Sequence, residues 1–208
     1  MNRYKYPRTP HLPWSPGKTN DDKVLKSIDH LIERDVVGTI KMDGECSTLY
    51  RDFLHARSID SSNHESRSWL KGFHASIKHL IPEGWRVCGE NLYAVHSIEY
   101  TDLESYFVGF SLWDDKNLCL SWHDTLSFFE EVGITPVTAI STVGTPISTV
   151  DKRFHMFFSD HEGYVIRVTD AFKYEEFGKC VAKYVRAGHV QTEQHWMNKK
   201  VIPNRLRA

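Results

Sequence analysis

The chain has 208 residues, 40% of them hydrophobic, which is enough to bury a sizeable core in one or at most two compact domains. Its four cysteines form no CxxC pair, which argues against a zinc ribbon or a disulfide framework and favours reduced thiols. No apolar run approaches the ~20 residues that a membrane-spanning helix requires, so we expect a soluble, cytoplasmic protein.

The formal net charge is -1, but the charges are unevenly distributed along the chain. Residues 1–20 contain four lysines or arginines and no acid, and residues 171–208 contain eight against three acids. Two basic ends therefore flank an acidic centre. This pattern is compatible with a phosphate-binding face, or with solvated tails that bind nothing. On the first interpretation, four C-terminal residues are expected to contact nucleic acid: Lys199, Lys200, Arg205 and Arg207.

Three segments have the apolar periodicity of helices. Residues 23–34 place Val24, Leu25, Ile28, Leu31 and Ile32 on one side, with Asn20 or Asp21 as a possible N-cap. A second helix is predicted at 66–81, where Pro82 would stop it. A third, shorter helix is predicted at about 124–131, before Gly133.

Strands are predicted between and after these helices, from β-branched and aromatic runs bounded by turn residues. Asp43-Gly44 is a favoured hairpin turn and would join the first two strands. The pattern predicts one mixed α+β domain over residues 1–208, built mainly on antiparallel sheets, with basic extensions at 1–20 and 187–208. The predicted strands are 36–42, 46–54, 85–93, 106–113, 134–140, 163–168 and 179–185.

The segment TIKMDGECSTLY, residues 39–50, contains a lysine that turn chemistry does not explain. At the end of a buried strand and facing a pocket, Lys41 would lose hydration, and its pKa would fall from about 10.4 towards neutrality. A neutral amine is a nucleophile. By itself K-x-D-G is a weak signal, because a surface lysine beside a turn has the same pattern.

KMDG resembles motif I of the covalent nucleotidyltransferases, the superfamily of ATP-dependent RNA and DNA ligases and mRNA capping enzymes. The resemblance covers about residues 39–186, and KYVRAGHVQTEQHW is similar to small RNA ligase-like proteins in particular. It implies a nucleotidyltransferase (ATP-grasp-like ligase) domain in which Lys41 forms a phosphoramide with AMP. Five later segments follow the order of the remaining motifs: ARS (56–58), GENLY (89–93), YFVGFSLW (106–113), EGYVIR (162–167) and VAKYVR (181–186).

The resemblance also implies roles for residues around the nucleotide. Lys183 would contact the α-phosphate, and Arg57 the nucleotide's phosphate or the 5'-phosphate of the strand being joined. Glu162 would bind Mg²⁺ or Mn²⁺ directly or through water, as hard cations prefer, and Glu90 would hold the ribose or the metal's water molecules. The implied catalytic residues are Lys41, Lys183 and Arg57, and the implied nucleotide site is Thr39, Ile40, Lys41, Arg57, Glu90, Phe110, Glu162, Lys183 and Arg186.

Several positions leave alternatives open. Phe110 aligns with the phenylalanine that stacks on the purine, but a strand aromatic is more often part of the core; Phe107 and Trp113 lie on the opposite strand face by parity. Val185 replaces the second lysine of the family's K-x-K, so the second cation is either Arg186 or Lys179, which would share a strand face with Lys183. The family's Phe-Asp-Ile is FSL here, and Ile40 replaces an acid that is common before the lysine.

The twelve histidines include His189 and His195 in the C-terminal segment, but no HExxH or zinc-type spacing is present. The spacing therefore favours structural or nucleic-acid-facing roles over a metal site. In the Pro-rich segment 11–22, Trp14 and Lys18 are candidates for contacting an RNA end, or for surface packing.

Only 22 residues follow Arg186, too few for the OB barrel that DNA ligases and capping enzymes append. The interpretation favoured is an ATP-dependent RNA ligase that joins 5'-phosphate and 3'-hydroxyl RNA ends through lysyl-AMP and an adenylylated RNA end, as a monomer active in RNA repair. One alternative is a DNA nick-sealing ligase. Another is a noncatalytic nucleic-acid or nucleotide-binding module.

Overall fold

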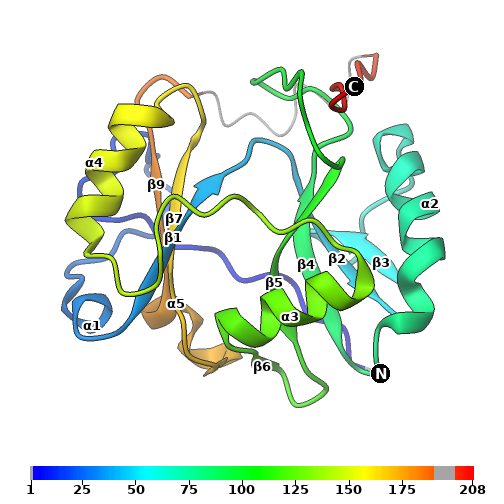
Figure 1. Cartoon of the computed structure of the whole chain (residues 1–208), viewed down its shortest axis with the longest axis horizontal. Coiled ribbons are helices and arrows are strands. Elements are labelled where there is room, and N and C mark those ends of the chain that lie inside the picture. The colour runs from blue at the N-terminus through cyan, green and yellow to red at the C-terminus, as the bar shows by residue number, and fades with distance from the viewer. Residues whose placement is uncertain (1, 190–199) are drawn as a thin grey trace.

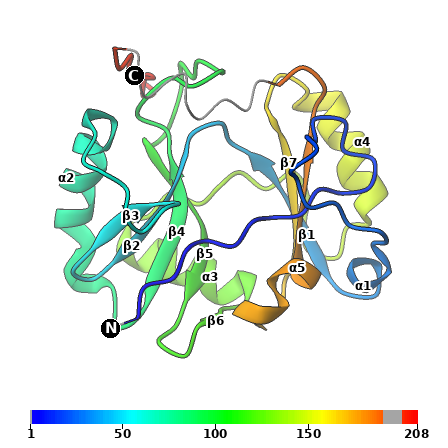
Figure 2. The same ribbon diagram turned by 180° about the vertical axis from the view of Figure 1, so that it is seen from behind.

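Two sheets of antiparallel strands form the centre of the computed structural model, which describes residues 2–189 and 200–208 (Figures 1 and 2). The first sheet has the strand order β1-β7-β9, formed by Val36–Lys41, Gly163–Val168 and Val181–Val185. The second has the order β3-β2-β4-β5-β6-β8. Its strands are Glu45–Tyr50 (β2), Leu54–Ala56 (β3), Arg86–Asn91 (β4), Phe107–Trp113 (β5), Leu118–Cys119 (β6) and Phe172–Lys173 (β8). The expected α+β class with mainly antiparallel sheets is confirmed, and the described strands form open sheets with no closed barrel.

Helices cover the outer faces of both sheets (Figure 1). α4 packs on β1 and β7, and α3 packs on β5. The hydrophobic core under α4 contains Val150 and Phe154, and that under α3 contains Phe129 and Val132. The α-helices are Asp29–Ile32 (α1), Ser68–Ile77 (α2), Trp122–Val132 (α3), Ile147–Phe157 (α4) and Phe177–Cys180 (α5), and 3-10 turns occupy Glu65–Arg67, Lys78–Leu80 and Tyr174–Glu176.

Two of the three predicted helices are confirmed. The predicted helix 66–81 corresponds to α2 with a 3-10 turn at each end. α3 begins after Ser121, whose hydroxyl accepts a hydrogen bond from the Asp124 amide, and it ends at Gly133 in the left-handed conformation that glycine favours (φ 74°). The predicted helix 23–34 is wrong except for the single turn α1, because the chain at Val24 is extended and pairs with His11. The sequence pattern also missed α4 and α5.

The predicted Asp43-Gly44 hairpin is wrong, because β1 and β2 belong to different sheets. β1 pairs along its length with β7, from Val36 opposite Val168 to Lys41 opposite Gly163, whereas β2 pairs with β3 and β4. The Asp43-Gly44 pair carries the chain from one sheet to the other. The end of β1 therefore faces the space between the sheets.

Residues 134–140 form no strand in the structure, contrary to prediction. They run instead as an extended bridge between the sheets: the Ile40 amide donates to the Thr138 carbonyl, and the Gly109 amide donates to the Thr135 carbonyl. Figure 1 shows this segment crossing from α3 towards the first sheet. It ties β5 to β1 and so fixes the spacing of the two sheets that line the cavity described below.

The C-terminal residues 200–208 lie against the loop that follows β4. Pro203 pairs with Ala94, and Leu206 pairs with Leu103. Arg205 forms an ion pair with Glu99, and Arg207 forms ion pairs with Asp102 and Glu104. These two arginines are thus paired with acids of their own chain. Lys199, which was also predicted to contact nucleic acid, and His195 fall outside the described residues. No helix in the described part of the chain is long and apolar enough to cross a membrane.

Candidate active site

A cavity of about 1300 Å³ lies between the two sheets. All predicted nucleotide-site residues except Arg186 line it, although they come from segments as far apart as β1 and β9: Thr39, Ile40, Lys41, Arg57, Glu90, Phe110, Glu162 and Lys183. A second cavity, of about 800 Å³ beside α1 and the start of α4, contains none of them. The sequence motifs thus converge on one place in the fold.

Lys41 lies at the end of β1 with its Nζ 2.6 Å from Oε2 of Glu162, the residue immediately before β7. The antiparallel pairing of Lys41 with Gly163 places these side chains together. Burial acts to lower the pKa of Lys41, but the carboxylates of Glu162 and Glu90 outweigh burial and raise it. The expectation of a lowered pKa is therefore wrong for the nucleotide-free protein. In this state Lys41 is an ammonium ion paired with Glu162.

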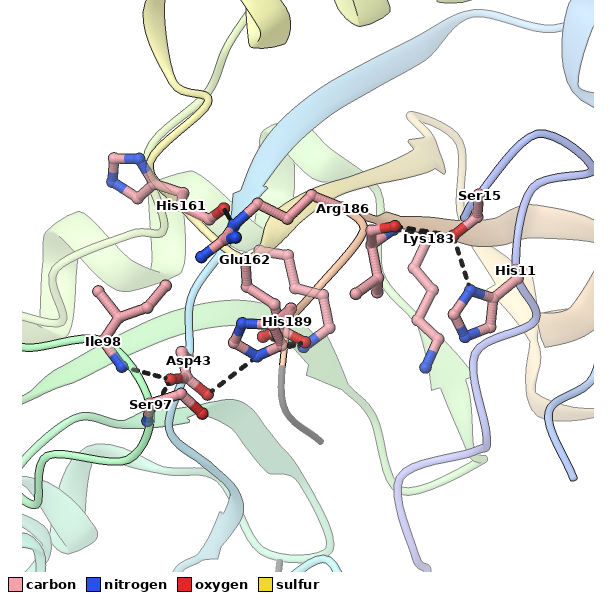
Figure 3. A network of polar contacts seen from close by, with 12 residues as sticks. His11, Ser15, Asp43, Ser97, Ile98, His161, Glu162, Lys183, Arg186 and His189 are labelled. Atoms are coloured by element: carbon pink, nitrogen blue, oxygen red, sulfur yellow. Dashed lines mark hydrogen bonds and ion pairs between the residues drawn. The ribbon is translucent and has the colours of Figure 1, made fainter. Parts of the chain in front are cut away.

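Three potential metal ligands meet beside this ion pair. Asp43, Glu162 and His189 each offer a ligand atom, and these atoms lie within 4.8 Å of one another. His189 Nε2 is 3.5 Å from Asp43 Oδ1 and 3.5 Å from Glu162 Oε1, and Figure 3 shows the three side chains pointing towards one another. The backbone amides of Ser97 and Ile98 donate to the other Asp43 oxygen and so orient this carboxylate.

This donor set fits a divalent cation. Two carboxylates and one imidazole suit Mn²⁺, and the carboxylate oxygens suit Mg²⁺. Burial acts to raise the pKa of Asp43, but hydrogen bonds from His189 and Ser97 lower it, so this carboxylate is charged at neutral pH. Sequence spacing could not identify the set, because its members lie in three distant segments.

Glu90, the other predicted metal residue, lies on β4 and is not a member of this set. Burial raises the pKa of Glu90 to about 8, although the charge of Lys41 acts to lower it. The Glu90 carboxyl is therefore mostly protonated at pH 7 in the nucleotide-free protein. A protonated carboxyl is a hydrogen-bond donor and a poor metal ligand, which favours a contact with a ribose hydroxyl over direct coordination.

The cations predicted to contact phosphate have different surroundings. Lys183 projects from β9 into the cavity, and burial together with the positive charge of Lys41 lowers its pKa. Arg57 also lines the cavity. Arg186 donates from Nε to the His161 carbonyl, and its amide donates to the Glu162 carbonyl, so it braces the turn before β7. Lys179 lies on α5 and is exposed, and the expectation that it shares a strand face with Lys183 is wrong.

The expectation that Phe107 and Phe110 lie on opposite faces of β5 is confirmed, but the same expectation for Trp113 is wrong. The pairing of β4 with β5 shifts register between Gly109 and Ser111, so Trp113 belongs to the core cluster that Phe110 packs against, whereas Phe107 belongs to another cluster. Phe110 lines the cavity and is partly buried, whereas Phe107 and Trp113 are fully buried in the hydrophobic core. The Phe110 ring also contacts Tyr6 edge to face, with ring centroids 5.0 Å apart. Tyr6, which motif reasoning missed, also lines the cavity.

Comparison with known proteins gives a consistent result. A family model described as RNA ligase matches residues 34–185. A search of curated protein sequences finds no match. An archaeal ATP-dependent RNA ligase is similar in structure, with a TM-score of 0.60 and 14% identity over 88% of this chain and 48% of that chain.

Structures of Naegleria gruberi RNA ligase are also similar. The form with PPi has a TM-score of 0.55 and 18% identity over 81% of this chain and 54% of that chain. A lysine-to-alanine mutant with ATP and Mn has a TM-score of 0.52 and 16% identity over 76% of this chain and 52% of that chain. The chain thus spans about half the length of the ligases that it matches. At these low sequence identities, the structural similarity shows a common fold.

Proposed function

The chain belongs to the RNA ligase family, and we propose on that premise that it is an ATP-dependent ligase joining RNA 5'-phosphate and 3'-hydroxyl ends. The observation that supports this most is the position of Lys41, beside Glu162 and in one cavity with Lys183 and Arg57. A covalent nucleotidyl transfer requires this combination of a nucleophilic amine, an acceptor for its proton and cations for the phosphates. On this proposal residues 1–208 act as one nucleotidyltransferase domain and as a monomer.

The proposed reaction has three steps. The neutral amine of Lys41 attacks the α-phosphorus of ATP, so that a P–N bond forms, the P–O bond to pyrophosphate breaks and pyrophosphate leaves. An oxygen of the RNA 5'-phosphate then attacks the same phosphorus, which transfers AMP to the RNA and releases Lys41. Finally the 3'-hydroxyl attacks the activated 5'-phosphate, the strands are joined and AMP leaves.

The residues of the cavity suit the first step. Lys41 must lose a proton before it attacks, and the Glu162 carboxylate 2.6 Å away is within reach of that proton. Lys183 and Arg57 would stabilise the charge on the α-phosphate, and Phe110 would stack on the base. Asp43, Glu162 and His189 would hold Mg²⁺ or Mn²⁺, which would neutralise phosphate charge in the transition state.

Labelled ATP tests this proposal directly. A denaturation-stable AMP label on the protein, followed by sealing of a 5'-phosphate RNA strand, is the expected result. Nicked duplex RNA, splinted RNA, single-stranded RNA and nicked DNA should be compared side by side, because preference for the DNA nick would favour a DNA ligase. Failure to form any label would favour a noncatalytic nucleotide-binding module. A role in cytoplasmic RNA repair follows only if RNA ends are sealed.

Replacing Phe110 with alanine should raise the ATP concentration needed for half-maximal labelling. A stacking contact between a base and an aromatic ring contributes about 1–3 kcal/mol, so an increase of roughly five- to 150-fold is expected. Phe157 on α4 is 66% exposed and does not line this cavity, so Phe157→Ala is the matched control. An unchanged ATP requirement in Phe110→Ala would remove Phe110 from the base site.

Neutralising Lys200 should weaken strand sealing and leave adenylylation intact. Lys200 is exposed and lines the cavity, whereas Arg205 and Arg207 are already paired with acids. Phosphate contacts release counterions, so Lys200→Ala should reduce the salt slope of RNA binding by about one. The double variant Arg205→Gln, Arg207→Gln should change this slope less. Sealing of a preadenylylated strand across a salt series measures both effects, and equal slopes in all three proteins would exclude a Lys200 phosphate contact.

A further inference from the structure

The N-terminal residues 10–25 form a segment that lies along the free edge of β9. The Lys183 amide donates to the Pro10 carbonyl, the Leu12 amide donates to the Lys183 carbonyl, and the Gly17 amide donates to the Val185 carbonyl. A Cβ at Gly17 would lie 2.6 Å from the Arg186 carbonyl oxygen, so the segment approaches β9 as closely as glycine allows. The strand that carries Lys183 is thus fixed by residues that precede the family match at 34–185.

Within this segment Asp22 contacts the Lys183 side chain. Asp22 Oδ1 is 3.8 Å from Lys183 Nζ, and the two side chains are only 9% and 14% exposed. The amide and the hydroxyl of Thr19 both donate to Asp22 Oδ2 at 2.9 Å. Burial acts to raise the pKa of Asp22, but these two hydrogen bonds and the charge of Lys183 lower it. Asp22 is therefore a fixed negative charge at the edge of the cavity.

The neighbouring His11 carries no positive charge that would compete with Lys183 for the Asp22 carboxylate. His11 is fully buried, and its Nε2 is 3.4 Å from Asp22 Oδ2. Burial and the positive charge of Lys183 lower the pKa of His11 to about 4, so the ring is neutral at pH 7. Its Nδ1 is held by the Ser15 hydroxyl, as Figure 3 shows. Lys183 is the cation that Asp22 balances.

We propose that Asp22 is a positioning residue that holds Lys183 charged and directed at the α-phosphate of ATP, an inference that rests on the function proposed above. Lys183 needs such a partner because burial and two nearby cations, Lys41 and Arg57, disfavour its positive charge, whereas Asp22 and, after it, Glu162 favour that charge. Asp22 Oδ1, 3.8 Å from Lys183 Nζ, offsets this repulsion. On this proposal Asp22, which also lines the cavity, acts through Lys183.

Single-turnover adenylylation with labelled ATP tests this inference in wild type and in Asp22→Asn, Asp22→Glu and Asp29→Asn. The asparagine keeps the size of the side chain and an oxygen for the Thr19 hydrogen bonds, but it removes the charge. Because Lys183 would act on charge that develops in the transition state, the rate constant at saturating ATP should fall about tenfold in Asp22→Asn, with a much smaller change in KM. Asp22→Glu keeps the charge and should recover most of the rate. Asp29 is an exposed acid of α1 and serves as the matched control.

The outcomes separate the two proposals. If wild type forms no lysyl-AMP, the proposed function fails, whatever Asp22 does. If wild type is labelled and Asp22→Asn has the same rate constant, or differs only in KM, the positioning role is wrong. An equal loss in Asp22→Asn and Asp22→Glu, accompanied by a lower melting temperature in both, would assign Asp22 to packing and likewise overturn the inference.

Discussion

Lys41→Ala is expected to abolish the covalent AMP label completely. Lys41 is the candidate nucleophile because it ends β1 inside the cavity and forms an ion pair with Glu162. Without the amine no P–N bond can form, so the loss should be total under any ATP concentration. Denaturing electrophoresis after incubation with labelled ATP and a divalent cation measures the result.

Removal of the Lys41 cation also breaks its ion pair with the buried Glu162 carboxylate, which destabilises a fold by itself. Lys41→Arg addresses this point, because arginine keeps the positive charge but is protonated at all accessible pH values and is no nucleophile. Both variants should be unlabelled, and the arginine variant should melt close to wild type. Lys179→Ala is the matched lysine control, since Lys179 is exposed on α5 and lies outside the cavity. A stable AMP label on Lys41→Arg would exclude Lys41 as the nucleophile.

Local sequence patterns predicted the parts of the fold that depend on local interactions. β7 was predicted with its observed bounds, and α3 ends at the glycine that its sequence indicated. The errors occur where a distant segment decides the structure. Residues 23–25 have helical periodicity but pair with His11, and the Asp43-Gly44 pair suits a hairpin but connects two sheets whose partners lie elsewhere in the chain.

In the candidate site, too, local sequence patterns predicted some features, and contacts between distant segments determine the others. The order of the motifs predicted residues that line the cavity, with the exception of Arg186, but it could not predict their protonation states. Lys41 and Glu162 are separated by 121 positions, and their ion pair reverses the direction of the pKa shift that burial alone predicts for Lys41. His189 and Asp22 lie outside the family match, at 34–185, and no spacing rule connects them with Glu162 or Lys183. Only the three-dimensional contacts reveal their positions.

Glu162→Gln should reduce adenylylation at least about a hundredfold, the scale observed when a group that stabilises a transition state is removed. The substitution removes the charge that a divalent cation requires from Asp43, Glu162 and His189, and it removes the acceptor for the Lys41 proton. Titration with Mn²⁺ alone, followed by electron paramagnetic resonance, gives a readout that does not depend on activity. We expect at least a tenfold weaker affinity for Mn²⁺.

Glu90→Gln is the matched control, because it removes a second carboxyl from the same cavity. Since burial raises the pKa of Glu90 to about 8, glutamine resembles the neutral form that predominates at pH 7, and Mn²⁺ affinity should change little. The reverse result, with Mn²⁺ binding lost in Glu90→Gln and retained in Glu162→Gln, would assign the ion to Glu90.

Glu162→Gln should also lower the pKa of Lys41, because the Glu162 carboxylate is the strongest influence that raises this pKa. If Glu162 were only a counter-ion for Lys41, its removal would therefore speed adenylylation; a slower reaction with weaker Mn²⁺ binding requires that this carboxylate also holds the metal.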